Sequence, residues 1–267
     1  MKHIFVTGAS SGIGLAIARA LTARGDEVWG TSRDPGRIPP MERLHPVQLD
    51  LSHPGSIDHA FKSALAEAGH FDVVINNAGS GHFGPAENLS DEEIANQFQV
   101  LVFGQLQLMR LALHTMRSHG HGLIINVTSL ASRLPVPFMA AYNSAKAAMA
   151  AFTMSVQLEL PDSRVRLVDL QPADINTGFN DALNKGSSPD PRQAARVGRT
   201  WDIVERNMEA APGPDLVAQR IGTLIDWANP PPRLTVGDRF QSKFAPFIFR
   251  FLPQQVRIWG LKRYYRL

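Results

Sequence analysis

The sequence predicts an α/β fold, a single domain in which helices cover both faces of a parallel β-sheet. Short apolar, β-branched runs alternate with helical patterns along most of the 267 residues, and no internal repeat or low-complexity linker interrupts them. This alternation is typical of right-handed βαβ units. With 44% apolar and 19% charged residues, the composition predicts a folded chain with a sizeable core rather than a disordered one.

Each element is expected from its own local pattern. Seven strands are expected at residues 3–7, 27–31, 47–49, 72–76, 123–128, 165–170 and 233–236. Five helices are expected between them, at residues 12–24, 55–68, 91–118, 139–160 and 214–228. Gly25 and Gly69 follow helical patterns and are typical of helix C-terminal caps. Ser90, followed by three acidic residues, predicts a capped helix start.

Two segments break the alternation. Residues 178–213 are polar and rich in proline and glycine, which predicts an insertion that covers the active site of a domain spanning residues 1–238. Residues 239–267 form a basic, aromatic C-terminal extension with eight of the 21 aromatic residues. Four phenylalanines have helical spacing, although Pro246 and Pro253 are expected to split any helix there.

Charge and residue usage exclude several classes of protein. The net charge is only +3, and seven of the 27 basic residues lie in the extension, which contains no acidic residue. Nucleic-acid binding is therefore disfavoured. The absence of cysteine excludes disulfides and thiolate chemistry, and together with the lack of a signal or membrane-spanning segment it leads us to expect a cytoplasmic protein. All nine histidines lie at or before His121 without metal-ligand spacing, so no metal is expected.

The first motif, TGASSGIG at residues 7–14, lies between the first expected strand and the first expected helix. A dinucleotide pyrophosphate needs backbone N–H groups and a helix N-terminus close to it, and glycines permit that approach. The motif therefore predicts cofactor contacts by Gly8, Ser10, Ser11, Gly12, Ile13 and Gly14. The alternative is an ordinary glycine turn.

The second motif, YNSAK, places Tyr142 and Lys146 one helical turn apart, so that the phenol and the ammonium project into the same space. The positive charge should lower the phenol pKa and allow Tyr142 to exchange a proton with a carbonyl oxygen. Ser129 ends the fifth strand and can reach the same oxygen, because ligands bind at the carboxyl ends of such strands. The alternatives are a surface Tyr–Lys pair and a turn serine.

The end of the second strand bears on the choice of cofactor. NAD enzymes place a carboxylate there for the ribose 2′-hydroxyl, whereas a 2′-phosphate requires arginine. This chain has Ser32 and then Arg33, which favours NADP over NAD. An ordinary surface pair of Arg33 with Asp34, or a shift of one residue that promotes Asp34, remains as the alternative.

These motifs resemble those of the short-chain dehydrogenase/reductase family of the Tyr-x-x-x-Lys type. TGASSGIG, NNAG at residues 76–79, Ser129, YNSAK and QPADINT at residues 171–177 occur in the family's order, and the resemblance covers residues 1–178 and 214–237. It implies a single Rossmann-type, doubly wound domain with a seven-stranded parallel sheet. It also implies that Ser129 polarises the substrate oxygen, that Tyr142 exchanges its proton and that Lys146 lowers the tyrosine pKa and holds the nicotinamide ribose. Further cofactor contacts are implied for Asp50, Leu51, Asn77, Ala78, Gly79, Pro172, Ile175 and Thr177.

The chain departs from the family pattern at two positions. The asparagine usual in F-x-V-N-x-x-G is Leu101 in FQVLVFG, so the water chain that this asparagine supports is in question. The glycine of the family's Pro-Gly is Ala173.

The sequence therefore predicts an NADP-preferring oxidoreductase that interconverts a secondary alcohol with a ketone or aldehyde. Val136, Pro137, Phe138 and Phe179 are expected near a hydrophobic substrate pocket. The alternatives are a cofactor-binding sensor or scaffold with little turnover, supported by Leu101, and a membrane-surface enzyme acting on lipid-like carbonyls. The resemblance also leads us to expect a homodimer or homotetramer.

The extension admits three interpretations. The favoured one folds it over the substrate pocket or against a partner subunit, with Phe240, Phe244, Phe247 and Trp259 in apolar contact. An anionic membrane surface is second, because cations and aromatic residues suit that interface. Nucleic acid is third.

Overall fold

The computed structural model describes residues 1–160, 164–180, 183–184 and 190–267, and contains a seven-stranded sheet in this part of the chain. All neighbouring strands are parallel, in the order β3-β2-β1-β4-β5-β6-β7. The strands are β1 His3–Val6, β2 Glu27–Ser32, β3 Leu44–Gln48, β4 Val73–Asn76, β5 Gly122–Val127, β6 Val165–Pro172 and β7 Arg233–Val236. The predicted doubly wound, seven-stranded parallel sheet is confirmed.

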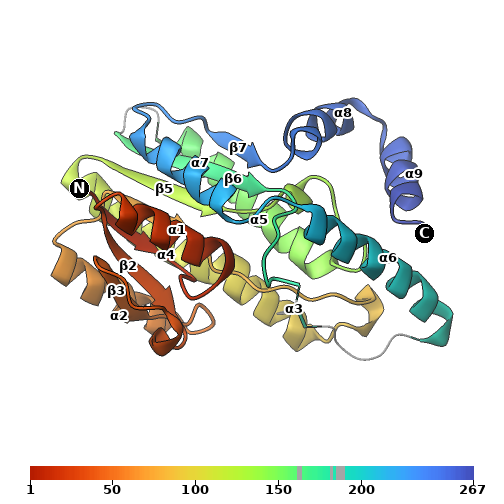
Figure 1. Ribbon diagram of the computed structural model, residues 1–267, viewed down its shortest axis with the longest axis horizontal. Helices are drawn as coiled ribbons and strands as arrows, with labels where there is room; N and C mark the ends of the chain where they lie inside the picture. The colour runs from red at the N-terminus through yellow and green to blue at the C-terminus, as the bar shows by residue number, and fades with distance from the viewer. Residues whose placement is uncertain (161–163, 181–182, 185–189) are drawn as a thin grey trace.

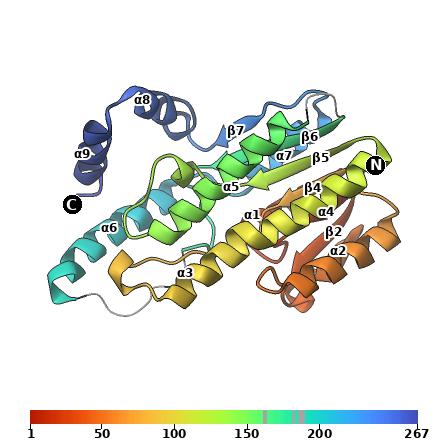
Figure 2. The same cartoon turned by 180° about the vertical axis from the view of Figure 1, so that it is seen from behind.

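Helices cover both faces of the sheet. Helices α1 (Gly12–Ala23) and α7 (Asp215–Asp226) pack on one face, which is turned toward the viewer in Figure 1. Helices α2 (Pro54–Ala68), α4 (Gly104–His119) and α5 (Ala140–Leu158) pack on the other face, seen in Figure 2. Each layer buries its own apolar cluster against the strands, which is why the strands are apolar on both sides.

The strand order reverses at β1 and β4, which are neighbours in the sheet although β2 and β3 separate them in sequence. Helix α1 follows β1 onto one face, and α4 lies on the opposite face. A crevice therefore forms at the carboxyl ends of these strands, where ligands of open α/β sheets bind.

The helix predicted at residues 91–118 is present with a local change of geometry. It consists of α3 (Asp91–Phe98), the π-helical turn η3 (Gln99–Phe103) and α4. Ser90 begins it with a capping box in which its hydroxyl accepts from the Glu93 N–H at 3.1 Å, as predicted. Such π-helical turns occur frequently at functional sites, and this one contains Leu101.

The segment 178–213 contains a helix that the sequence analysis did not predict, α6 (Pro191–Ala210). Parts of the expected insertion, residues 181–182 and 185–189, lie outside the described residues. Val197, Trp201 and Val204 occupy positions i, i+4 and i+7 of the helix and pack against a small apolar cluster. This narrow apolar stripe in an otherwise polar segment was the sequence pattern that could have predicted the helix.

The extension is helical. After β7 come the π-helical turn η5 (Phe240–Phe244), α8 (Ala245–Phe251) and α9 (Gln254–Tyr264), which Figure 1 places beyond the carboxyl ends of the strands, on the side of α6. Pro253 separates α8 from α9 as predicted, but the prediction for Pro246 is wrong, because this residue lies in the first turn of α8. The wider π-helical turn before it accommodates the missing N–H and the ring. No helix of the described residues is long and apolar enough to cross a membrane.

Candidate active site

One large cavity of about 1290 Å³ lies at the carboxyl ends of the strands. Every residue to which the sequence analysis assigned a catalytic or cofactor-binding role lies on its wall. These residues are Gly8, Ser10, Ser11, Gly12, Ile13, Gly14, Arg33, Asp50, Leu51, Asn77, Ala78, Gly79, Ser129, Tyr142, Lys146, Pro172, Ile175 and Thr177. The fold thus brings together residues from the ends of six strands, β1 to β6, and from helix α5.

The glycine-rich turn after β1 is tied to the end of β4. The hydroxyl of Thr7 accepts from the backbone N–H groups of Asn77 and Ala78, each at 2.9 Å. Gly8 has φ +74°, and a Cβ there would lie 2.9 Å from Cα of Ala78. At Gly14 a Cβ would lie 2.0 Å from the carbonyl oxygen of Gly8. Both positions therefore require glycine.

The N-terminus of α1 is free to bind an anion. Ser11 is the N-cap residue, but its side chain makes no capping hydrogen bond, and the first turn contains no acidic residue. The uncapped N–H groups and the positive end of the helix dipole thus border the cavity. This arrangement fits the pyrophosphate of a dinucleotide.

The end of β2 presents cations to the cavity. The strand ends at Ser32, so Arg33 is the first residue beyond it. Asp34 Oδ1 accepts from the N–H of Gly36 at 3.0 Å and begins the short helix η1 (Pro35–Arg37). Arg37, which the sequence analysis did not single out, lines the same cavity as Arg33.

The part of the cavity wall that contains Asp50 and Leu51 is held by local hydrogen bonds. The Asp50 carboxylate accepts from the backbone N–H of Ser52 at 2.9 Å and from its hydroxyl at 2.6 Å. Burial opposes the charged form, but these hydrogen bonds and the nearby His53 lower the pKa of Asp50 overall. The carbonyl of Leu51 accepts from Gln99 at 3.2 Å, which joins this loop to η3.

Ser129, Tyr142 and Lys146 converge at the centre of the cavity. Ser129 follows β5, Tyr142 lies in the first turn of α5, and the serine hydroxyl lies close enough to the phenol to lower its pKa. Lys146 lies one turn later, with Nζ 5.9 Å from the centroid of the tyrosine ring. The ammonium is 3% exposed and donates to the carbonyl oxygen of Val127 at 2.8 Å. A serine hydroxyl and a phenol can therefore meet one substrate oxygen.

Burial has the largest effect on the pKa values of Tyr142 and Lys146. Desolvation raises the pKa of Tyr142 to about 12, although the hydrogen bond with Ser129 lowers it. Desolvation lowers the pKa of Lys146 to about 8, while the negative charge of Asp169 raises it. The pKa of the Tyr142 phenol is therefore raised rather than lowered as expected. In this weakly solvated site, burial disfavours the charged forms of both side chains.

Leu101 occupies the neighbourhood of Lys146 with an apolar side chain. It is fully buried and packs in a cluster with Val102 and Ala145, against which the ring of Tyr142 also lies. A Cβ built on Gly79 would lie 3.1 Å from Leu101 Cδ2 and 3.8 Å from Lys146 Nζ. The side chain at position 101 can therefore offer no hydrogen bond to water near the lysine.

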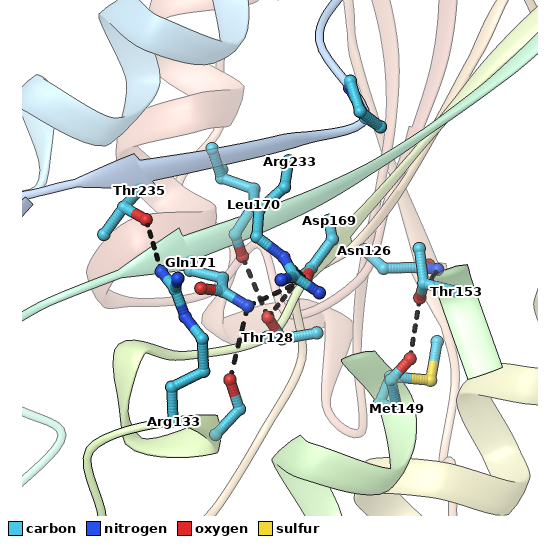
Figure 3. Close-up of polar contacts among 12 residues, drawn as sticks. Asn126, Thr128, Arg133, Met149, Thr153, Asp169, Leu170, Gln171, Arg233 and Thr235 are labelled. Atoms are coloured by element: carbon cyan, nitrogen blue, oxygen red, sulfur yellow. Dashed lines mark hydrogen bonds and ion pairs between the residues drawn. The ribbon is translucent and has the colours of Figure 1, made fainter. Parts of the chain in front are cut away.

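A buried polar network supports the strand end that carries Ser129 (Figure 3). The carboxylate of Asp169, on β6, accepts from the Thr128 hydroxyl, from Gln171 Nε2 at 2.8 Å and from Arg233 Nε at 2.7 Å. The network thereby joins β5, β6 and β7 directly behind the site. Sequence reasoning missed Asp169, and the signal was an acidic residue inside an otherwise apolar strand.

The other part of the cavity is largely apolar. Val136 and Phe179 line it as predicted, but Pro137 and Phe138 do not. Phe138 turns away and packs against Phe83, with 6.0 Å between the ring centroids. Helix α6 and the extension complete this wall with Val204, Met208, Ile248, Phe249, Leu252, Val256, Leu261 and Tyr265.

The extension thus contributes to the cavity, although largely through other residues than expected. Of the aromatic residues named beforehand, Phe240 lines the cavity, whereas Phe244, Phe247 and Trp259 do not. All four are more than half exposed. Phe244, Phe247 and Trp259 therefore do not fold over the pocket, and their contact with a partner subunit stays a prediction.

Together, the fold and the site are those of an oxidoreductase with a Rossmann-type domain. The sequence model of the short chain dehydrogenase family matches residues 2–188, and the chain belongs to this family. It is 30% identical over 268 aligned residues to the 3-ketodihydrosphingosine reductase of Bacteroides thetaiotaomicron, with 99% of this chain and 98% of that protein covered.

Solved structures agree with this assignment. A short-chain dehydrogenase from Streptomyces avermitilis superposes with a TM-score of 0.80 at 28% identity, covering 98% of this chain and 93% of that one. The alcohol dehydrogenase of Thermococcus sibiricus, complexed with 5-hydroxy-NADP, gives a TM-score of 0.73 at 27% identity and covers 90% of this chain and 97% of its own. Among the related structures, a 3-ketoacyl-(acyl-carrier-protein) reductase from Brucella melitensis is complexed with NADH and the Thermococcus sibiricus enzyme with 5-hydroxy-NADP.

Proposed function

We propose that this protein is an NADPH-dependent reductase that converts a long-chain, lipid-like ketone into a secondary alcohol. The observation that carries the proposal is the composition of the cavity. Ser129 and Tyr142 share one wall with the glycine-rich turn, and a second wall is built from apolar side chains of α6, α8 and α9. Such a wall suits an extended hydrocarbon chain, whose burial gains about 0.8 kcal/mol per methylene.

Two arginines support NADPH as the preferred cofactor. Arg33 and Arg37 both line the cavity beyond β2 and can offer a 2′-phosphate planar, charge-assisted hydrogen bonds. The competing carboxylate of Asp34 is engaged as a cap of η1. A ribose 2′-hydroxyl would therefore lack its usual acceptor, whereas a 2′-phosphate would meet two cations.

The bound cofactor supplies the hydride that reduces the carbonyl carbon. Ser129 donates a hydrogen bond to the carbonyl oxygen and orients it toward Tyr142. Tyr142 gives its phenolic proton to that oxygen as the alkoxide charge develops. Lys146 stabilises the resulting phenolate with its positive charge, so the reaction needs the protonated ammonium. With its pKa near 8, this lysine should limit reduction at alkaline pH.

The relative from Bacteroides thetaiotaomicron supports the substrate class. The alignment includes the extension, and the name of that protein specifies a reductase of a ketone on a long-chain sphingoid base. The same class of substrate suits this chain, because most of the apolar wall comes from residues 239–267.

The decisive experiment measures NADPH oxidation with 3-ketodihydrosphingosine and with ketones of increasing chain length. We expect kcat/KM to rise about fourfold for each methylene that the apolar wall buries. Phe249→Ala, which trims the wall, should reduce the preference for long chains, whereas Trp227→Ala, which does not line the cavity, should preserve it. Equal kcat/KM for short and long ketones would refute the substrate class. Tight NADPH binding without any turnover would favour the sensor alternative.

The cofactor preference has its own test. Arg33→Ala and Arg37→Ala should each raise the KM for NADPH by roughly 10- to 150-fold, the equivalent of one lost charge-assisted contact, and leave the KM for NADH nearly unchanged. Arg19→Ala, an exposed cation on α1 outside the cavity, is the matched control. Equal effects on both cofactors would show that neither arginine reads the 2′-phosphate.

A further inference from the structure

The outer face of the extension exposes five large aromatic side chains. Phe240, Phe244, Phe247, Phe251 and Trp259 are between 58% and 68% exposed, and together we call them the tail surface. The four phenylalanines follow one another at intervals of four, three and four residues, so they share one side of η5 and α8. Phe247 and Phe251 contact edge to face, with 5.1 Å between their centroids. Exposed aromatic groups of this size mark an interaction site.

Basic residues lie among these aromatic side chains. Lys243 and Arg250 lie one turn from Phe247 on either side, and Lys262 and Arg263 lie one turn after Trp259. Six of the seven basic residues of the extension are exposed, the exception being Arg257, which contacts the ring of Phe249. None of the seven forms an ion pair with a carboxylate of the described residues. The tail surface is therefore both apolar and strongly cationic.

We propose that the tail surface docks the enzyme onto an anionic lipid bilayer. Aromatic rings favour the boundary between headgroups and acyl chains, and lysine and arginine beside them are attracted by anionic headgroups. A second copy of the chain fits less well. A two-fold interface would place this face against itself and oppose the six exposed cations of one extension to those of the other, without a single acidic partner from the extension.

The tail surface is continuous with the cavity. Phe240 and Ile248 are 62% and 49% exposed, and both also line the cavity wall. The inner side of α8 and α9 contributes apolar residues to the cavity wall, and the outer side carries the aromatic and basic residues. Figure 2 shows both helices at one end of the molecule, clear of the helices that cover the sheet. Docking by this face would bring the cavity wall to the bilayer, where lipid-like ketones reside.

The extension is also anchored to the body by side chains. Gln241 Nε2 donates to Asp174 at 2.6 Å in the loop after β6, and Asn207 of α6 donates to the Tyr264 hydroxyl at 2.8 Å. A shift of the extension on contact with a bilayer would therefore also move residues in the walls of the cavity. The docking proposal does not depend on the proposed substrate, because vesicle binding is measured without substrate or cofactor.

The experiment is co-sedimentation of the full-length protein with vesicles. One set contains phosphatidylcholine alone, and the other contains equal parts of phosphatidylcholine and phosphatidylglycerol. We expect binding to the anionic vesicles at low salt, weaker binding at high salt and little binding to the neutral vesicles. Brominated lipid should quench Trp259, and this quenching should disappear in Trp259→Phe.

Matched variants locate the contact. Replacing Arg250, Lys262 and Arg263 together by glutamine should weaken partitioning between about tenfold and a hundredfold. The double variant Phe247→Ser with Phe251→Ser should abolish the vesicle binding that persists at high salt. The controls are Arg19→Gln with Arg220→Gln for charge and Leu158→Ser for exposed apolar area, and they should bind like the unaltered protein.

Three outcomes would overturn the proposal. The first is no binding to anionic vesicles at low salt. The second is equal loss of binding in the tail and control variants. The third is a change in molecular mass of the tail variants in sedimentation, without any change in vesicle binding, which would identify the face as a contact between copies. Circular dichroism of each variant separates lost docking from lost folding.

Discussion

Replacing Asp169 by asparagine should move the alkaline limit of carbonyl reduction to lower pH. Asp169 is 1% exposed, and its negative charge raises the pKa of Lys146 against the opposing effect of burial. The lysine is positively charged below its pKa of about 8 and loses this charge as the pH rises through that value. Removing the carboxylate lowers the pKa further, so the phenolate of Tyr142 loses its stabilising charge at a lower pH.

The same substitution should reduce stability. Asparagine keeps one acceptor, but it ends the ion pair with Arg233 and turns an amide toward other donors. Breaking a buried pair costs about 3–5 kcal/mol, and because the Arg233 side chain is 36% exposed and water can solvate it, we expect about 2–3 kcal/mol. For a domain of this size, this corresponds to a decrease in Tm of roughly 4–12 °C.

The assay is a pH profile of kcat for NADPH-dependent reduction, measured alongside thermal unfolding. Gln171→Leu is the matched control, because it removes one donor to Asp169 and leaves the carboxylate charge in place. It should lower Tm without moving the alkaline limit. If the alkaline limits of Asp169→Asn and the unaltered enzyme coincide while Tm falls, Asp169 acts only in folding and the electrostatic reasoning is refuted.

Three further substitutions test the site. Tyr142→Phe should reduce kcat by at least about a hundredfold while NADPH binding, followed by fluorescence, stays nearly unchanged; more than a few per cent of residual activity would contradict its role as proton donor. Gly14→Ala should abolish cofactor binding, because its Cβ would lie 2.0 Å from the Gly8 carbonyl oxygen, whereas Gly55→Ala, with no atom within 4 Å, should be neutral in the same titration. Leu101→Asn should raise kcat, reduce the solvent isotope effect and lower Tm, since it adds a polar group near Lys146 at the cost of burying an amide; if kcat and the isotope effect do not change, proton supply through this position does not limit the rate.

Local patterns in the sequence were sufficient for the sheet and for the chemical centre. The five inner strands are almost completely buried, and burial on both faces keeps them largely apolar, whereas the edge strands β3 and β7 are partly exposed. The spacing of Tyr142 and Lys146 depends only on the helix repeat, and the glycine-rich turn depends only on the backbone freedom of a few neighbouring residues. These features are encoded in windows of four to fifteen residues, so they can be predicted without knowing the rest of the fold.

Helix α6 and the helices of the extension were harder to predict because their local sequence patterns are weak. The apolar stripe of α6 is narrow because the helix covers only a small cluster. In the extension, Pro246 led us to expect an interrupted helix, but the π-helical turn before α8 allows this proline to lie in the first turn of the helix. In both segments, contacts with the rest of the fold stabilise a helix that the amino-acid composition of the segment does not favour.

By itself, the sequence determined the family, the order of the strands with the helices that cover the sheet, and the residues that line the cavity. Only the tertiary structure decided that Asp169 lies behind Lys146, that Arg37 joins Arg33, and that the tail lines the cavity with one side while Trp259 points outward. The physical reason is the range of the interactions. Secondary structure follows from neighbours along the chain, whereas burial, pKa and exposure depend on residues that are distant in sequence and meet only when the sheet has formed.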